Sequence, residues 1–175
     1  IVGINPVADG PAVWLTNFDT DHGLFPEGLG SMLVVTLGVF YAFSTFVMQA
    51  LAQLPPQQGM TAMQRINVAV LNPWFLGVFM ATALLVLACA IAAFLPCTPH
   101  RSPWLLAGGL LYLATFLITG LRNVPLNERL ARLDAAAPEA TGAWVAYVRT
   151  WTLWNHARTA AAVASAACCA AALAA

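Results

Sequence analysis

The stretch PWFLGVFMATALLVLACAIAAFL, residues 73–95, carries 23 consecutive residues without a charge. A helix that crosses the hydrocarbon core of a bilayer needs about 20 such residues. Three further uncharged segments occur at residues 31–54, 103–121 and 159–175. A buried helix of a soluble bundle would show a polar face, which these segments lack. We therefore expect an all-α integral membrane four-helix bundle with these four segments as spans.

The overall composition supports this prediction. Of 175 residues, 61% are hydrophobic and only 8% are charged, whereas a soluble domain has about 25% charged residues. All seven basic residues are Arg, and the net charge is zero, which excludes a nucleic-acid-binding surface. Because the chain begins with Ile and shows no signal-peptide pattern, we expect it to be processed or trimmed.

The distribution of Arg predicts an orientation in the membrane. The connections after the first and third spans lie on the same side of the membrane. With their flanks they hold six Arg, whereas the other side holds one, Arg101. The six are Arg65, Arg122, Arg129, Arg132, Arg149 and Arg158. The positive-inside rule then places both termini outside the cytoplasm, in the plasma membrane. Residues 1–30 form a separate non-cytoplasmic segment, and residues 31–175 form the bundle.

The first of these connections should contain a short interfacial helix. The sequence TAMQ, residues 61–64, has the spacing of a capping box, with Thr61 as N-cap and Gln64 reaching back. We expect this helix to end near Leu71. Asn72 can then cap the next helix, with Pro73 in its first position. In the N-terminal segment, PAVWLTNF could lie as another interfacial helix, and FDTDHG reads as a solvated loop rather than a cation site.

The third and fourth helices should extend beyond the membrane as a hairpin. Leucines recur at helical spacing after the third span, and Pro125 should kink this helix near Leu121. The fourth helix should begin near residues 138–139 and continue to the end of the chain. Along it, Trp144, Trp151 and Arg158 share one face.

A set of polar side chains gathers at the predicted cytoplasmic end of the bundle: Asn67, Arg122, Asn123, Asn127, Asn155, His156 and Arg158. Asn123 and Asn127 are four residues apart and share a helical face, whereas His156 turns about 100° away from Asn155. A side-chain amide at the level of the membrane must form hydrogen bonds with other groups of the protein, because an unpaired amide is unfavourable in an apolar environment. The cluster could therefore form a site, or it could only lock the helices together.

Other kinds of site lack their residue patterns. Cys89, Cys97, Cys168 and Cys169 show no metal-ligand spacing and are expected to be small packing residues. A haem held by two histidines would need a second His at the depth of His156. No carboxylate falls in a span, which excludes a di-iron bundle. We expect no metal.

Three stretches carry a family resemblance: FYAFSTFVMQALAQLPPQQGMTAMQRIN (40–67), RNVPLNERLARLD (122–134) and WTLWNHART (151–159). In this order and spacing they resemble the anthrone oxygenase-like family of small four-helix membrane proteins, much of which is described only as a domain of unknown function. The resemblance extends over residues 31–175 and leaves residues 1–30 outside.

The resemblance implies an oxidoreductase, a monooxygenase that converts an anthrone-like or planar phenolic molecule with O₂ and needs no cofactor. Such a reaction needs a base and a stabilised oxyanion in a dry pocket. His156 is the candidate base because its pKa range lies near neutrality. The candidates for holding the oxyanion are Arg158, Arg122, Asn123, Asn127 and Asn155, with Asn67 as a further binding residue. The aromatic side chains of Trp151, Trp154 and Tyr41 could enclose a planar substrate.

Two alternatives stay open at this point. The chain could be a non-catalytic membrane subunit or scaffold whose Asn/Arg cluster only locks the bundle, or a haem or quinone carrier using His156. The expected partners are the lipid bilayer and a lipophilic aromatic molecule. The final span holds 11 Ala among 17 residues, which favours close helix contact within the bundle or in a homo- or hetero-oligomer.

Overall fold

The computed structural model describes residues 27–92 and 103–174. The helical elements in chain order are α2 (Glu27–Ala42), η1 (Phe43–Val47), α3 (Met48–Gln53), α4 (Pro56–Ala69), α5 (Pro73–Ala92), α6 (Pro103–Ile118), η2 (Thr119–Asn123), α7 (Val124–Ala131) and α8 (Ala140–Ala174). The two η elements are π-helical segments inside longer helices. The expected all-α fold is confirmed, and the residues outside these ranges include the PAVWLTNF and FDTDHG stretches.

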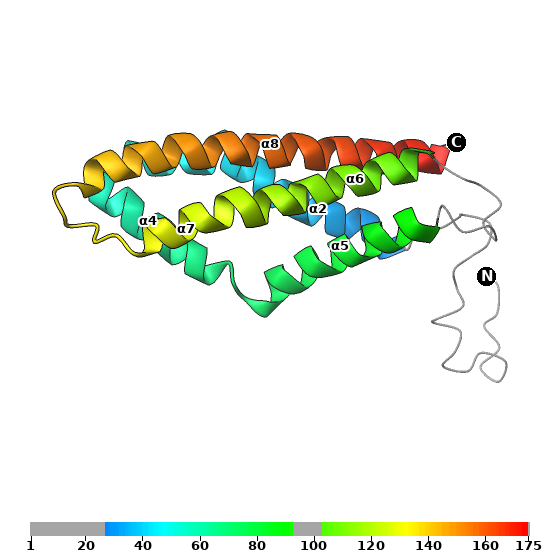
Figure 1. The fold of residues 1–175 in the computed structure, drawn as a ribbon, viewed down its shortest axis with the longest axis horizontal. Coiled ribbons are helices and arrows are strands. Elements are labelled where there is room, and N and C mark those ends of the chain that lie inside the picture. The colour runs from blue at the N-terminus through cyan, green and yellow to red at the C-terminus, as the bar shows by residue number, and fades with distance from the viewer. Residues whose placement is uncertain (1–26, 93–102, 175) are drawn as a thin grey trace, which may run out of the picture.

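The helices lie side by side as an elongated bundle (Figure 1). Helix α8 has 35 residues and runs along the continuous helix formed by α6, η2 and α7. The α2–η1–α3 helix packs on the same α8, and α5 returns beside α6. Three described segments are long and apolar enough to cross a membrane: Leu33–Gln53, Pro73–Ala92 and Pro103–Ala131. Residues 159–174 of the predicted fourth span fall within α8, which is not among these three segments.

The tight contact between α6 and α8 follows from small residues. The Ser165 hydroxyl donates to the Gly108 carbonyl at 2.8 Å, and a Cβ on Gly108 would lie 3.0 Å from the Cys169 sulfur. Buried Cys169 is therefore a packing residue in this contact, as expected from the sequence. Part of the Ala-rich C-terminal half of α8 therefore packs against α6 inside the bundle.

Helix α4 begins earlier than the sequence indicated. Pro55 and Pro56 start it, and Thr61 lies in its second turn, where its hydroxyl donates to the Gln57 carbonyl at 2.8 Å. The capping box at Thr61 is therefore wrong. Gln64 instead donates to the carbonyls of Leu130 at 2.8 Å and Leu133 at 3.0 Å, which ties α4 to the end of α7.

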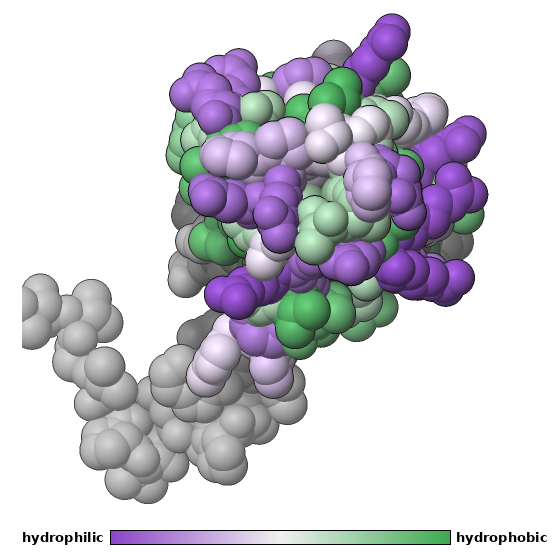
Figure 2. Space-filling view, turned by 90° about the vertical axis from the view of Figure 1, so that its left-hand side faces the viewer, coloured by the Kyte–Doolittle hydropathy of each residue, from purple (hydrophilic) through white to green (hydrophobic). Residues whose placement is uncertain are grey.

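The turn between α4 and α5 is as predicted. The Asn72 side-chain oxygen accepts the Phe75 backbone N–H at 3.0 Å, and this bond caps α5 with Pro73 in the first position. Helix α8 begins at Ala140, within two residues of its predicted start. The end of the bundle formed by α4, α7 and the start of α8 carries many hydrophilic side chains (Figure 2).

Beneath that polar end lies an apolar core, where Met60, Met63, Leu130 and Trp144 are almost completely buried. Gly59 allows this packing because a Cβ there would lie 2.7 Å from the Leu51 carbonyl oxygen. The short helix α4 is thus held against α3 and α8. This packing fixes one wall of the cavity described next.

Candidate functional site

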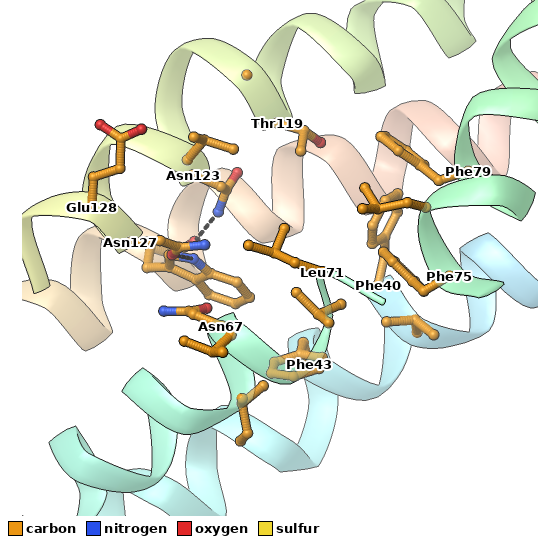
Figure 3. Close-up of a pocket in the computed structure, with 18 of the residues that line it drawn as sticks. Phe40, Phe43, Asn67, Leu71, Phe75, Phe79, Thr119, Asn123, Asn127 and Glu128 are labelled. Atoms are coloured by element: carbon orange, nitrogen blue, oxygen red, sulfur yellow. Dashed lines mark hydrogen bonds between the residues drawn. The ribbon is translucent and has the colours of Figure 1, made fainter. Parts of the chain in front are cut away.

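A cavity of about 440 Å³ lies between α2–η1, α4, α5, η2–α7 and α8 (Figure 3). Its wall is mainly apolar and includes six aromatic side chains, from Phe40, Phe43, Phe75, Phe79, Phe116 and Trp151. The Phe79 ring stacks on Phe116, with centroids 5.3 Å apart and planes at 14°, and on Phe75 at 6.3 Å and 9°. Parallel aromatic faces of this kind suit a flat, apolar ligand.

Arg158 is the charged residue of the cavity interior and is only 7% exposed. Its guanidinium carbon lies 4.2 Å from the Phe40 ring centroid and 5.2 Å from that of Trp151. Its Nη1 donates to the Thr119 hydroxyl at 3.4 Å. Within residues 27–92 and 103–174, the guanidinium pairs with no carboxylate. A buried cation without a counter-ion is unfavourable unless a ligand supplies the negative charge.

Asn155 holds this guanidinium in place. Its side-chain oxygen accepts the Arg158 Nε–H at 2.8 Å, and its amide donates to the Phe40 carbonyl at 2.9 Å and to the Ser44 hydroxyl at 2.6 Å. The Ser44 and Thr159 hydroxyls are 2.9 Å apart. Asn155 is fully buried, and its hydrogen bonds account for both ends of the amide. It therefore positions Arg158 without facing the cavity.

Asn127 organises the aromatic side of the site. Its side-chain oxygen accepts both the Tyr147 hydroxyl and the Trp151 indole N–H at 2.8 Å. Burial raises the pKa of Tyr147, which keeps the phenol protonated as the donor in this contact. Asn127 thereby fixes the Trp151 ring against the cavity.

Asn123 and Asn67 leave polar atoms without partners at the cavity. Asn123 is 1% exposed and donates its amide to the Trp151 carbonyl at 3.3 Å (dashed in Figure 3), but its Oδ1 accepts from no described group. The Asn67 Nδ2 on α4 is also buried; it makes no hydrogen bond of regular geometry within the described residues and lies near the Tyr147 hydroxyl. Both residues line the cavity, and the Asn123 Oδ1 offers an unpaired acceptor to a ligand.

Both π-helical segments border this site. Ser44 lies in η1, whereas Thr119 and Asn123 lie in η2, so side chains that contact Arg158, Asn155 or Trp151 come from the widened turns. The second segment sits where Pro125 lacks the N–H that would continue the regular pattern. The irregularity expected near Leu121 is therefore a π-helical turn, and the helix continues to Ala131. Such turns are frequent at functional sites.

Five of the ten candidate residues line the cavity: Asn67, Asn123, Asn127, Trp151 and Arg158. Asn155 is directly behind them. The other four lie elsewhere. His156 is exposed on another face of α8, Tyr41 is 58% exposed, and the Arg122 guanidinium lies 4.6 Å from the Trp154 ring, outside the cavity.

Several residues of the site were missed from the sequence. The phenylalanines are hidden in uniformly apolar spans, where no pattern distinguishes a cavity wall from a lipid-facing side chain. Nothing in the sequence marks Ser44 and Thr119 as residues of the site, because each is only a small hydroxyl side chain within an apolar segment. Glu128 lines the rim of the cavity, with its carboxylate directed outward in Figure 3.

In the parts of the chain that are described, no three His, Cys, Asp or Glu side chains lie close enough together to hold a metal ion. The polar chemistry of the cavity comes instead from one guanidinium, side-chain amides and hydroxyls. These groups can bind an oxyanion and orient a flat ligand.

Comparison with known protein families gives a match to the anthrone oxygenase family model over residues 71–168. This range includes the second and third stretches that carried the resemblance and most of the cavity wall, whereas the first stretch, residues 40–67, lies outside it. The searches of curated proteins and of solved structures gave no match. Because the family model covers more than half of the sequence, including Asn123, Asn155 and Arg158, the chain belongs to the anthrone oxygenase family.

Proposed function

We propose that this protein is a cofactor-independent membrane monooxygenase that oxidises a planar phenolic or anthrone-like molecule with O₂ in the aromatic cavity. The observation that carries the proposal is the buried Arg158 guanidinium, which faces this cavity without a carboxylate partner in the described residues. We also propose that the protein lies in the plasma membrane with both termini outside the cytoplasm, in keeping with the Arg distribution.

The cavity suits the ionised form of such a substrate. A flat ring system would lie along the Phe79 and Phe116 faces, with its phenolate or enolate oxygen at Arg158. A guanidinium in a poorly hydrated pocket stabilises an oxyanion much more than it would in water. Binding there therefore lowers the pKa of the phenol or of an activated CH₂ group.

The reaction balances without a further reductant. Loss of one proton from the CH₂ carbon gives a delocalised carbanion, which reduces O₂ and combines with it to form a carbon–oxygen bond. The resulting peroxide takes up a proton and loses water, which leaves a C=O group. One O₂ is consumed, and one oxygen atom enters the product while the other leaves as water.

Glu128 carries the one carboxylate among the cavity-lining residues. We assign it the role of base, acting through water because its carboxylate points outward. His156, the base expected from the sequence, lies on another face of α8. Glu128→Gln should therefore lower kcat more than His156→Gln does.

The decisive experiment compares two arginines that each stack on an aromatic ring. The protein is purified in detergent, and O₂ uptake is measured with 1,8-dihydroxyanthrone as the model substrate. Arg158→Gln should lower kcat/KM at least about 100-fold, whereas Arg122→Gln, which alters the contact with Trp154 outside the cavity, should leave it unchanged.

Three results would contradict the proposal. Equal activity of the two Arg variants would remove Arg158 from the site. Absence of uptake by the wild-type protein, without a visible absorption band, would favour the scaffold function. A Soret band in the visible spectrum of the purified protein would instead indicate a haem carrier.

A further inference from the structure

A second hollow of about 520 Å³ lies on another face of α8, between that helix and the η1–α3 segment. Four polar residues of α8 line it, Arg149, Thr150, Thr152 and His156, and Arg149, Thr152 and His156 are at positions i, i+3 and i+7. These spacings place them on one helical stripe. Gln49 lines it from α3. His156 thus has a defined environment that the proposed oxygenase reaction does not use.

The hollow is rich in hydrogen-bond donors. Arg149 carries a permanent positive charge, His156 and Gln49 can each donate a hydrogen bond, and no carboxylate is among the lining residues. The Thr152 hydroxyl is buried and makes no hydrogen bond within the described ranges. An unpaired buried hydroxyl between a cationic and an imidazole side chain is well placed to donate to an anion.

The rest of the lining includes the hydroxyl residues Ser44 and Thr150 and the apolar residues Met48, Ala52, Val148 and Leu153. Leu153 is 63% exposed, so apolar surface continues outward from the donors. The hollow also lies beside the end of the candidate span Leu33–Gln53. A polar stripe next to an apolar surface at the end of a span is where lipid headgroups meet a membrane protein.

We propose that this hollow binds the phosphate headgroup of a membrane phospholipid. The phosphate oxygens would accept from Arg149, Thr152 and His156, and the start of an acyl chain would lie over Leu153 and Val148. The apolar lining favours a lipid over free phosphate, which could use only the donors. This site is independent of the proposed oxidation in the aromatic cavity.

The test is native mass spectrometry of the full chain, titrated with phosphatidylglycerol or with inorganic phosphate. The wild-type protein should retain one phosphatidylglycerol molecule. The double variant Arg149→Gln/His156→Gln should bind it at least about tenfold more weakly. Thr152→Val, which keeps the side-chain shape, should weaken binding by a smaller factor and serves as a second variant if the double variant fails to fold.

The matched control is Arg65→Gln/Arg132→Gln, which removes two exposed charges that line neither hollow. Its retention of phosphatidylglycerol should equal that of the wild-type protein. Equal weakening in both double variants would reduce the effect to general charge attraction and overturn the site. Displacement of the lipid by an equal concentration of inorganic phosphate would overturn the lipid assignment.

Discussion

Asn155 and Asn123 are both almost completely buried, but their hydrogen bonding differs. The Asn155 amide is bonded at both ends, to Arg158, the Phe40 carbonyl and Ser44. Asn123 makes one long bond of 3.3 Å and leaves its oxygen unpaired in the described structure. We infer that Asn155 stabilises the fold of the site, whereas the Asn123 oxygen accepts a hydrogen bond from a ligand.

Leucine at each position should separate these roles. Asn155→Leu leaves the Arg158 Nε–H without its partner and removes one hydrogen bond each from the Phe40 carbonyl and the Ser44 hydroxyl, and should destabilise the protein by about 3 kcal/mol. Asn123→Leu removes an unsatisfied buried oxygen and should leave stability unchanged or slightly raised, while lowering kcat/KM. Thermal unfolding in detergent, followed by circular dichroism, measures the first effect, and O₂ uptake measures the second. Equal loss of stability in the two variants would show that the cluster only locks the bundle.

Single residues were predictable where helical spacing decides their direction. Trp151 and Arg158 were assigned to one face of the fourth helix, and both line the cavity. The same periodicity turned His156 away, as the structure shows. Tyr41 and Arg122 could not be placed, because the face that each presents depends on how one helix packs against the next. That packing is decided by contacts such as Ser165 with Gly108, which no single helix contains.

The helices themselves followed closely from the sequence. The apolar runs gave their positions, Asn72 gave the start of α5, and Pro125 gave the site of η2. The π-helical segment η1 could not have been predicted, because Phe43–Val47 contains neither Pro nor Gly. Its irregularity accompanies long-range contacts of Ser44 with α8, which are invisible to local sequence rules.

The position of helix α4 depends on its close approach to α3 and α8 at Gly59. A Cβ at position 59 would lie 2.7 Å from the Leu51 carbonyl oxygen and 2.9 Å from the Trp144 ring. Gly59→Ala should therefore displace α4 from α3 and α8 and destabilise the protein by about 1–3 kcal/mol. Thermal unfolding measures the change.

Gly142→Ala is the matched control, because a Cβ there meets no atom of the described residues within 4 Å. Alanine favours a helix over glycine by about 1 kcal/mol at an interior position, so this variant should be neutral or slightly more stable. If the two variants behaved alike, the close packing of α4 would not contribute to stability.

At the scale of the whole molecule, the site lies well inside the bundle. Helix α5 has 20 residues, which corresponds to about 30 Å, the thickness of a bilayer core. Trp74 at its start is 86% exposed, and Trp104, at the start of the returning helix α6, is 48% exposed. Exposed Trp side chains at the ends of apolar helices are typical of membrane–water interfaces. Thr115, which donates to the Arg158 carbonyl at 3.3 Å, lies about 16 Å along α6 from Trp104, so Arg158 is well inside the bundle. A buried ionisable residue among apolar helices is costly and points to function.

The aromatic cavity has an apolar rim, which includes Val68, Leu71 and Val124, exposed by 73%, 65% and 41%. A lipophilic substrate dissolved in the bilayer would enter past these side chains without crossing water.

Leu71→Glu places a charge on this route and should raise KM about tenfold while leaving kcat unchanged, because the loss of one apolar contact and the added charge together correspond to about 1–2 kcal/mol. Val145→Glu adds the same charge at an apolar residue that is 62% exposed and outside the cavity, and should change neither constant. Steady-state O₂ uptake in phospholipid vesicles measures both. A fall in kcat with unchanged KM in Leu71→Glu would mean that this rim acts in the chemical step and does not admit the substrate.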